Sequence, residues 1–169
     1  MAEAANKRRV FFALWPDADT AARIDAVAVA LVRDGRRIRV DKLHMTLAFV
    51  GTVATPVVEQ LAGLADDISA APFRLCLDHV GYFRRPRILS LGPSQMPTAL
   101  DELATAVVAI AGPGARQRRF CPHVSLARRA PVPAADCRVD PVFWDVCDFC
   151  LVESGTHGTP GDYRCLRRW

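Results

Sequence analysis

The chain has 169 residues, of which 51% are hydrophobic and 24% charged, and its formal net charge is +4. This balance is that of a globular domain with enough apolar residues for a core. The longest apolar run, Ala26–Val32, is too short to span a membrane, and no secretory leader is visible, so we expect a cytoplasmic protein. The mild positive charge permits an anionic partner such as nucleic acid without demonstrating one.

The first half of the chain predicts a strand, a helix, a strand and a second helix. A strand over Arg9–Trp15 ends at a proline, and apolar residues at helical spacing predict a helix over Asp17–Val32. A strand is expected over His44–Val50, after which Gly51 is expected to turn the chain. The second helix is predicted to begin with Thr55 as its N-cap, followed by proline at its first position.

The second half predicts one helix and five strands. The helix is expected over Pro97–Ala111, where a Gly-Pro-Gly sequence ends it. The strands are expected over Phe73–Val80, Arg87–Leu91, His123–Ala127, Val142–Val152 and Tyr163–Trp169.

A strand, a helix and a histidine-containing strand occur in this order twice. The offset is 77 residues between Pro16 and Pro93 and 79 residues between His44 and His123. We therefore expect one bilobal domain over residues 1–169, with an internal repeat at about 9–80 and 87–152. The predicted fold is α+β, with two pseudo-symmetric lobes of mainly antiparallel sheet, outer helices and a central cleft.

Each histidine-containing strand places a hydroxyl side chain two residues after its histidine. His44 is followed by Thr46, and His123 is followed by Ser125. Positions i and i+2 share one face of a strand, so each histidine and its hydroxyl partner should line the cleft, whereas Phe49 should lie on the opposite face.

Two imidazoles across a cleft suit displacement at phosphorus. The unperturbed pKa of histidine, about 6.5, allows one ring to donate a proton and the other to accept one. The two hydroxyl groups would donate hydrogen bonds to the non-bridging oxygens of the phosphate. The symmetry of the motifs leaves open which histidine is the acid.

Two other histidines are not included in the site. His157 also precedes a threonine by two residues, but it lies between glycines and beside a proline, in a predicted loop. His79 has no hydroxyl partner, and we interpret it as a structural histidine on a half-buried strand.

The six cysteines are expected to be reduced thiols. Only Cys147 and Cys150 have the spacing of a metal or redox pair, and no second pair is suitably placed to complete a zinc site. We interpret both as inert, half-buried thiols. The sequence predicts neither a bound metal nor another cofactor.

The segments HMTLAFVG and PHVSLAR resemble the two signature motifs of the 2H phosphoesterase superfamily. The segments RRVFFALWPD and YRCLRRW resemble its RNA 2′,3′-cyclic phosphodiesterase branch, also called the 2′-5′ RNA ligase family, and the similarity runs essentially end to end. It implies that His44 donates a proton to the leaving O3′ and that His123 accepts one from water, without a metal, to give a 2′-phosphate. Ser125 stands where the family usually has threonine; the hydroxyl is kept, but serine is freer at χ1.

The expected partner is RNA or a nucleotide with a 2′,3′-cyclic phosphate, bound by a monomer. Arg128 is the predicted phosphate ligand, because a guanidinium can engage two oxygens. Phe11 and Phe49 are candidates for stacking on a base or, equally, for the core. Two basic clusters could guide RNA or could form a solvated surface. These clusters are Arg84, Arg85 and Arg87, and Arg116, Arg118 and Arg119.

Three alternative functions remain open. The same fold could act on linear 2′-5′ linkages, by cleavage or by ligation, or on another cyclic nucleotide. A catalytically silent RNA-binding module could also keep a basic cleft.

Overall fold

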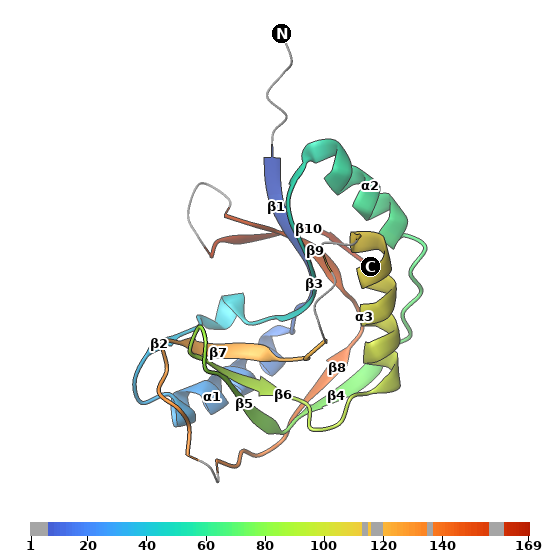
Figure 1. Cartoon of the computed structure of the whole chain (residues 1–169). Coiled ribbons are helices and arrows are strands. Elements are labelled where there is room, and N and C mark those ends of the chain that lie inside the picture. Colours follow the sequence, from blue (N-terminus) through green and yellow to red (C-terminus); the bar gives the residue numbers. More distant parts are fainter. Residues whose placement is uncertain (1–6, 113–114, 116–119, 135–136, 156–160) are drawn as a thin grey trace.

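The computed structural model describes residues 7–112, 115, 120–134, 137–155 and 161–169 (Figure 1). The strands are β1 (Lys7–Leu14), β2 (Arg36–Arg37), β3 (Met45–Ala54), β4 (Phe73–Leu77), β5 (His79–Phe83), β6 (Ile88–Gly92), β7 (Val124–Arg128), β8 (Val142–Val146), β9 (Cys150–Ser154) and β10 (Tyr163–Arg168). The helices are α1 (Ala18–Leu31), α2 (Thr55–Ala65) and α3 (Thr98–Ala111), with a 3-10 helix, η1, over Val40–Lys42. The predicted α+β class is confirmed.

An eight-stranded antiparallel sheet forms the centre of the molecule, in the order β10-β9-β1-β3-β7-β6-β5, with β2 paired to β7. The strands that directly follow the two motif histidines, β3 and β7, are neighbours in it, joined through the pair Met45 and Val124. Each motif histidine precedes its strand by one residue, so the expected strand starts at His44 and His123 are one residue too early. A second sheet contains β4 and β8. This order brings two motifs that are distant in sequence to the middle of one sheet.

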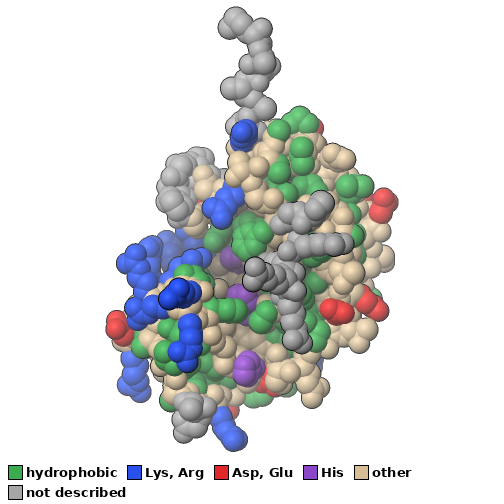
Figure 2. All heavy atoms as spheres, in the orientation of Figure 1, with side chains coloured by type: hydrophobic (Ala, Val, Ile, Leu, Met, Phe, Trp, Pro, Cys, Tyr) green, Lys and Arg blue, Asp and Glu red, His purple; other side chains and the backbone are tan. Residues whose placement is uncertain are grey.

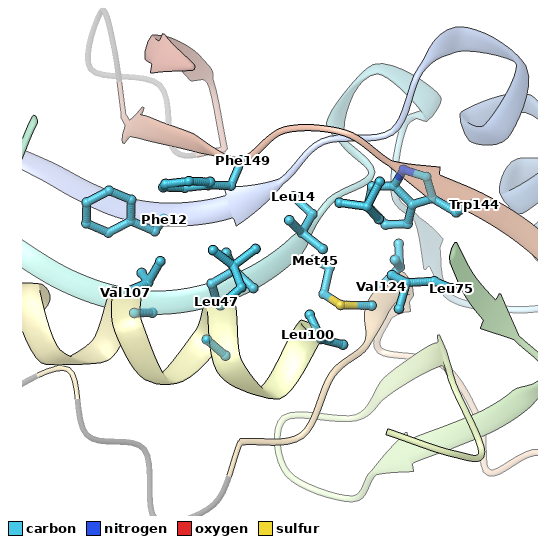
Figure 3. Packing of buried hydrophobic residues seen from close by; sticks show 14 of the residues in the cluster. Phe12, Leu14, Met45, Leu47, Leu75, Leu100, Val107, Val124, Trp144 and Phe149 are labelled. Carbon is cyan, nitrogen blue, oxygen red and sulfur yellow. The ribbon is translucent and has the colours of Figure 1, made fainter. Parts of the chain in front are cut away.

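The main hydrophobic core lies between one face of the large sheet and the helices (Figure 3). Leu47 on β3 packs near Leu100 and Val107 of α3, while Trp144 of the small sheet packs near Val124. Burying a large apolar side chain of this kind stabilises the fold by about 1.5–3 kcal/mol. The opposite face of the large sheet is left for the functional site.

The helices begin close to where the sequence predicts. Asp17 caps α1, since its carboxylate accepts hydrogen bonds from the Thr20 backbone nitrogen at 2.9 Å and the Thr20 hydroxyl at 2.7 Å. The N-cap of α2 is Ala54, so the prediction of Thr55 as the cap is wrong by one residue. No helix in the described part of the chain is long and apolar enough to cross a membrane.

Three strand predictions are wrong in instructive ways. The run Phe73–Val80 is two strands in different sheets, β4 and β5, and Val142–Val152 likewise divides into β8 and β9. Gly51 does not turn the chain; it continues β3 with φ of +92°, at a point where the pairing with β1 shifts register. Glycine adopts this left-handed backbone without the strain that a β-carbon would introduce.

Each strand that follows a motif histidine carries a β-bulge at the same position of the motif. On β3 the extra residue is Leu47, whose two neighbours face consecutive residues of β1. On β7 it is Leu126, whose two neighbours face consecutive residues of β6. A bulge adds one residue to one strand and reverses the alternation of faces beyond it. The prediction that Phe49 points away from the histidines is therefore wrong, and Arg128 shares the histidine face for the same reason.

Candidate active site

A cavity of about 840 Å³ opens on the sheet face opposite the main core. Its lining includes all the catalytic residues predicted from the motifs, namely His44, Thr46, His123 and Ser125. Figure 2 shows histidine side chains in the central hollow and Lys and Arg side chains gathered along one side of it. The structure therefore brings the predicted residues together; their catalytic roles stay predictions.

The two motif histidines are held in the same way. His44 Nδ1 lies 2.8 Å from the carbonyl oxygen of Lys42, and His123 Nδ1 lies 2.8 Å from that of Cys121. A carbonyl oxygen only accepts, so each Nδ1 carries the hydrogen and donates it. The proton that each ring exchanges is then the one on Nε2.

Aromatic rings surround the imidazole of His44. Trp15 stacks on it with ring centroids 5.0 Å apart and planes inclined by 8°, and Tyr163 approaches edge-on at 5.1 Å. Phe11 lies 5.2 Å away. Because Tyr163 comes from the last strand and Trp15 directly follows the first, no local pattern in the sequence marks either ring as a neighbour of His44.

This environment lowers the pKa of His44 below its ordinary value. The largest cause is desolvation, which disfavours the charged imidazolium. The hydrogen bond to the Lys42 carbonyl opposes this effect, and electrostatic interactions with His123 and Arg128 add to it. The same charges that repel an imidazolium would attract an anionic phosphate to the site.

Close backbone packing positions His123. A β-carbon added to Gly92 on β6 would lie 2.5 Å from the carbonyl oxygen of Pro122, so only glycine lets the two segments approach this closely. The ring of Phe83 lies 4.7 Å from the His123 imidazole. Neither neighbour was predicted from the sequence.

The two phenylalanines predicted to stack on a base differ in how far they are exposed. Both line the cavity, with ring centroids 5.7 Å apart. Phe11 is only 2% exposed and packs against His44 and Tyr163, which leaves little surface for a ligand. Phe49 is 45% exposed, so it is the ring available for stacking.

Arg128 lines the cavity as predicted, and five further basic residues line it, with no acidic residue among the described residues of the lining. These five are Arg9, Arg36, Arg37, Arg39 and Lys42. Three of them, Arg36, Arg37 and Arg39, form the basic run that precedes His44 in the sequence. Neither of the two basic clusters predicted from the sequence is found among the described residues that line the cavity. In the first cluster, Arg84, Arg85 and Arg87 are exposed but lie elsewhere. The second cluster, Arg116, Arg118 and Arg119, lies outside the described residues.

The remaining candidates lie away from the cavity or outside the described residues. His79 is exposed on β5, so its interpretation as a half-buried structural histidine is wrong. His157 lies outside the described residues. Of the two cysteines expected to be half-buried, Cys150 is buried and Cys147 is exposed. The Cys150 thiol donates a hydrogen bond to the Ala13 carbonyl oxygen at 3.3 Å. Burial raises the pKa of the Cys150 thiol to about 12. Among the described residues, no group of three or more His, Cys, Asp or Glu is placed to hold a metal ion.

Comparisons with known proteins agree with one another. A model of the 2′-5′ RNA ligase superfamily matches residues 15–158. The RNA 2′,3′-cyclic phosphodiesterase of Escherichia coli (strain K12) is 36% identical over 146 residues, which cover 80% of this chain and 79% of that protein. The crystal structure of E. coli LigT in apo form superposes with a TM-score of 0.85 at 32% identity, covering 96% of both chains. A crystal structure of a Thermus thermophilus protein superposes with a TM-score of 0.74 at 27% identity, covering 95% of this chain and 96% of the other.

Proposed function

Because the chain belongs to the 2′-5′ RNA ligase superfamily, we propose that it hydrolyses the 2′,3′-cyclic phosphate at the end of an RNA to give a 2′-phosphate. The observation that carries this proposal is the pair of equivalent histidines in one cavity. In both rings, Nδ1 donates a hydrogen bond to the backbone carbonyl two residues earlier. Nε2 is therefore left to exchange protons with a ligand in the cavity.

In the proposed reaction His123 removes a proton from water, and the resulting oxygen attacks phosphorus. The bond from phosphorus to O3′ breaks, and His44 Nε2 donates its proton to the departing O3′. The phosphate then stays on O2′, and His44 ends neutral while His123 ends protonated. The division of roles between the two rings follows the resemblance to the 2H phosphoesterases. Because the pKa of His44 is lowered in the free protein, its acid role requires the bound anionic phosphate to stabilise the imidazolium. General acid and base transfers of this kind contribute about 10²–10⁴-fold each to the rate.

Three further side chains would stabilise the charge on the phosphate. Thr46 and Ser125 line the cavity beside the two histidines and can donate hydrogen bonds to the non-bridging oxygens. Arg128 is exposed at the end of β7 and lines the same cavity, where a guanidinium can bind two oxygens. These residues supply positive charge and hydrogen-bond donors, and we propose that the reaction needs no metal.

The decisive experiment incubates an oligonucleotide bearing a 2′,3′-cyclic phosphate with the protein in the presence of EDTA. We expect turnover to a 2′-phosphate, identified by mass spectrometry and by its resistance to enzymes that remove 3′-phosphates. A 3′-phosphate product would contradict the proposed bond cleavage. Binding of RNA without product at any pH would favour a silent binding module instead.

We also propose that the protein acts as a cytoplasmic monomer formed by one domain with an internal repeat. The equivalent β-bulges and the equivalent histidine contacts in β3 and β7 support the repeat. The cysteines are all free thiols, which agrees with a reducing compartment. Light scattering at micromolar concentration tests the monomer; the mass of a dimer would contradict it.

A further inference from the structure

Two arginines lie directly opposite each other across the edge pairing of β2 and β7. Arg36 pairs with Arg128 in the antiparallel register, so their side chains share one face. Both line the cavity, and both are exposed. Like charges directly opposite each other on a sheet are destabilising. A bound anion would remove that repulsion.

Neither guanidinium is neutralised within the described part of the protein. No described carboxylate forms an ion pair with Arg36 or Arg128. Three other cations that line the cavity, which lie on β2 or between β2 and β3, do have carboxylate partners. Arg37 lies 3.5 Å from Asp25, Arg39 lies 2.9 Å from Asp41, and Lys42 lies 3.0 Å from Asp162.

We infer that Arg36 binds a second phosphate, the phosphodiester that precedes the cyclic phosphate in an RNA chain. This inference rests on the proposed function, which assigns the cyclic phosphate to the histidines and Arg128. Directly opposite residues of an antiparallel pair have Cβ atoms about 5 Å apart, and arginine side chains extend well beyond that. Two neighbouring phosphates can therefore be contacted by this pair. The site then favours an oligonucleotide end over a cyclic mononucleotide.

The position of Arg36 distinguishes it from Arg9, the other cavity arginine without a described carboxylate partner. Arg9 lies on β1, which is separated from β7 by β3. Arg36 instead lies on the strand that pairs with β7 itself, the strand that carries Ser125 and Arg128. A phosphate next to the one held by Arg128 is therefore closer to Arg36.

The test compares two dinucleotides of uridine with a terminal 2′-phosphate, which correspond to the proposed product. One has an ordinary phosphodiester between its nucleosides, and the other has an uncharged methylphosphonate. We expect the wild-type protein to bind the charged dinucleotide about tenfold more tightly, and Arg36→Gln to abolish most of that ratio. Added salt should also weaken binding of the charged dinucleotide less in Arg36→Gln than in the wild-type protein, because one contact to a phosphate is lost.

Arg37→Gln is the matched control, because it removes the same charge from the same short strand but from a side chain directed at Asp25. It should change the affinity ratio less than twofold. An unchanged ratio in Arg36→Gln, or a wild-type ratio near one, would overturn the inference. If only Arg9→Gln abolished the preference for the charged dinucleotide, the second phosphate would bind near Arg9. That result would also overturn the inference.

Turnover of the corresponding cyclic phosphates is measured in parallel. Failure of the wild-type protein to hydrolyse either dinucleotide cyclic phosphate would contradict the proposed function. The affinity ratio of the 2′-phosphates would still decide whether Arg36 recognises the internucleotide charge. The two proposals thus fail through different measurements.

Discussion

The indole of Trp15 lies parallel to the imidazole of His44, with ring centroids 5.0 Å apart. This contact excludes water from one side of the ring and fixes its orientation. Replacing Trp15 by alanine should therefore raise the pKa of His44 toward its ordinary value, since desolvation is the largest cause of the shift. NMR titration of the histidine ring measures it, and a pKa that falls further would contradict the explanation.

The same Trp15→Ala change should also lower kcat, by between about 10- and 100-fold, because His44, the proposed acid, would transfer its proton less efficiently once misplaced. Trp15→Phe keeps a flat ring at this position and should retain most of the rate. Equal losses in both variants would show that the indole does more than hold the ring.

His44→Ala and His123→Ala should each lower turnover of a 2′,3′-cyclic phosphate by about 10²–10⁴-fold. Each change removes one of the two proposed proton transfers. His79→Ala is the control, since that histidine is exposed on β5 and does not line the cavity. If the His79 variant lost as much activity as the other two, the assignment of the acid and the base would be wrong.

His123→Gln should raise the pKa of His44 in the free protein. The electrostatic interaction with His123 lowers that pKa, so removing the His123 imidazole favours the imidazolium of His44. The rise should be partial, because desolvation, the larger cause, remains. Arg128→Gln should act in the same direction. NMR titration of His44 in the two variants checks the sign, and a lower pKa in either one would show that the charges do not interact as inferred.

Gly92→Ala should impair catalysis through the backbone. Its new β-carbon would meet the Pro122 carbonyl oxygen at 2.5 Å, so the segment that carries His123 has to move. We expect a loss of about 10- to 100-fold in kcat and of about 1–3 kcal/mol in the free energy of unfolding. Kinetics and urea denaturation measure the two effects.

Gly63→Ala is the control for that experiment. Gly63 lies in α2, and a β-carbon there meets nothing within 4 Å, so the change should stabilise the helix by about 0.5–1 kcal/mol and leave turnover unchanged. If Gly92→Ala behaved like Gly63→Ala, the close approach at Pro122 would not be what holds His123 in place.

The sequence predicted the catalytic candidates better than their surroundings. In an extended segment, a histidine and a hydroxyl residue two positions apart share a face, and both pairs line the cavity although each histidine lies just before its strand. Trp15 and Tyr163 could not be found in this way, because they reach His44 through strand pairings between distant parts of the chain. The sequence of an apolar run also does not indicate which sheet its residues join. For this reason the single strand expected over Phe73–Val80 is two strands in the structure.

The orientation of Phe49 is the clearest case of what alternation alone misses. The extra residue Leu47 reverses which face of the sheet the later side chains occupy. The amino-acid types around Leu47 do not predict this bulge. The matching bulge at Leu126 acts in the same way on Arg128. The pairing of each strand with its neighbour, and not the strand's own sequence, fixes these positions.

The two bulges also give the cavity a direction. They bring the fifth residue after each motif histidine to the ligand side, and these two residues differ: Phe49 on β3 is aromatic, and Arg128 on β7 is cationic. A cleft with two interchangeable halves would accept a ligand in either of two opposite orientations. With a flat apolar ring on one side and a fixed charge on the other, only one orientation places a base on the ring and a phosphate on the charge. If RNA binds as proposed, this pair of unequal side chains favours one polarity of the bound strand.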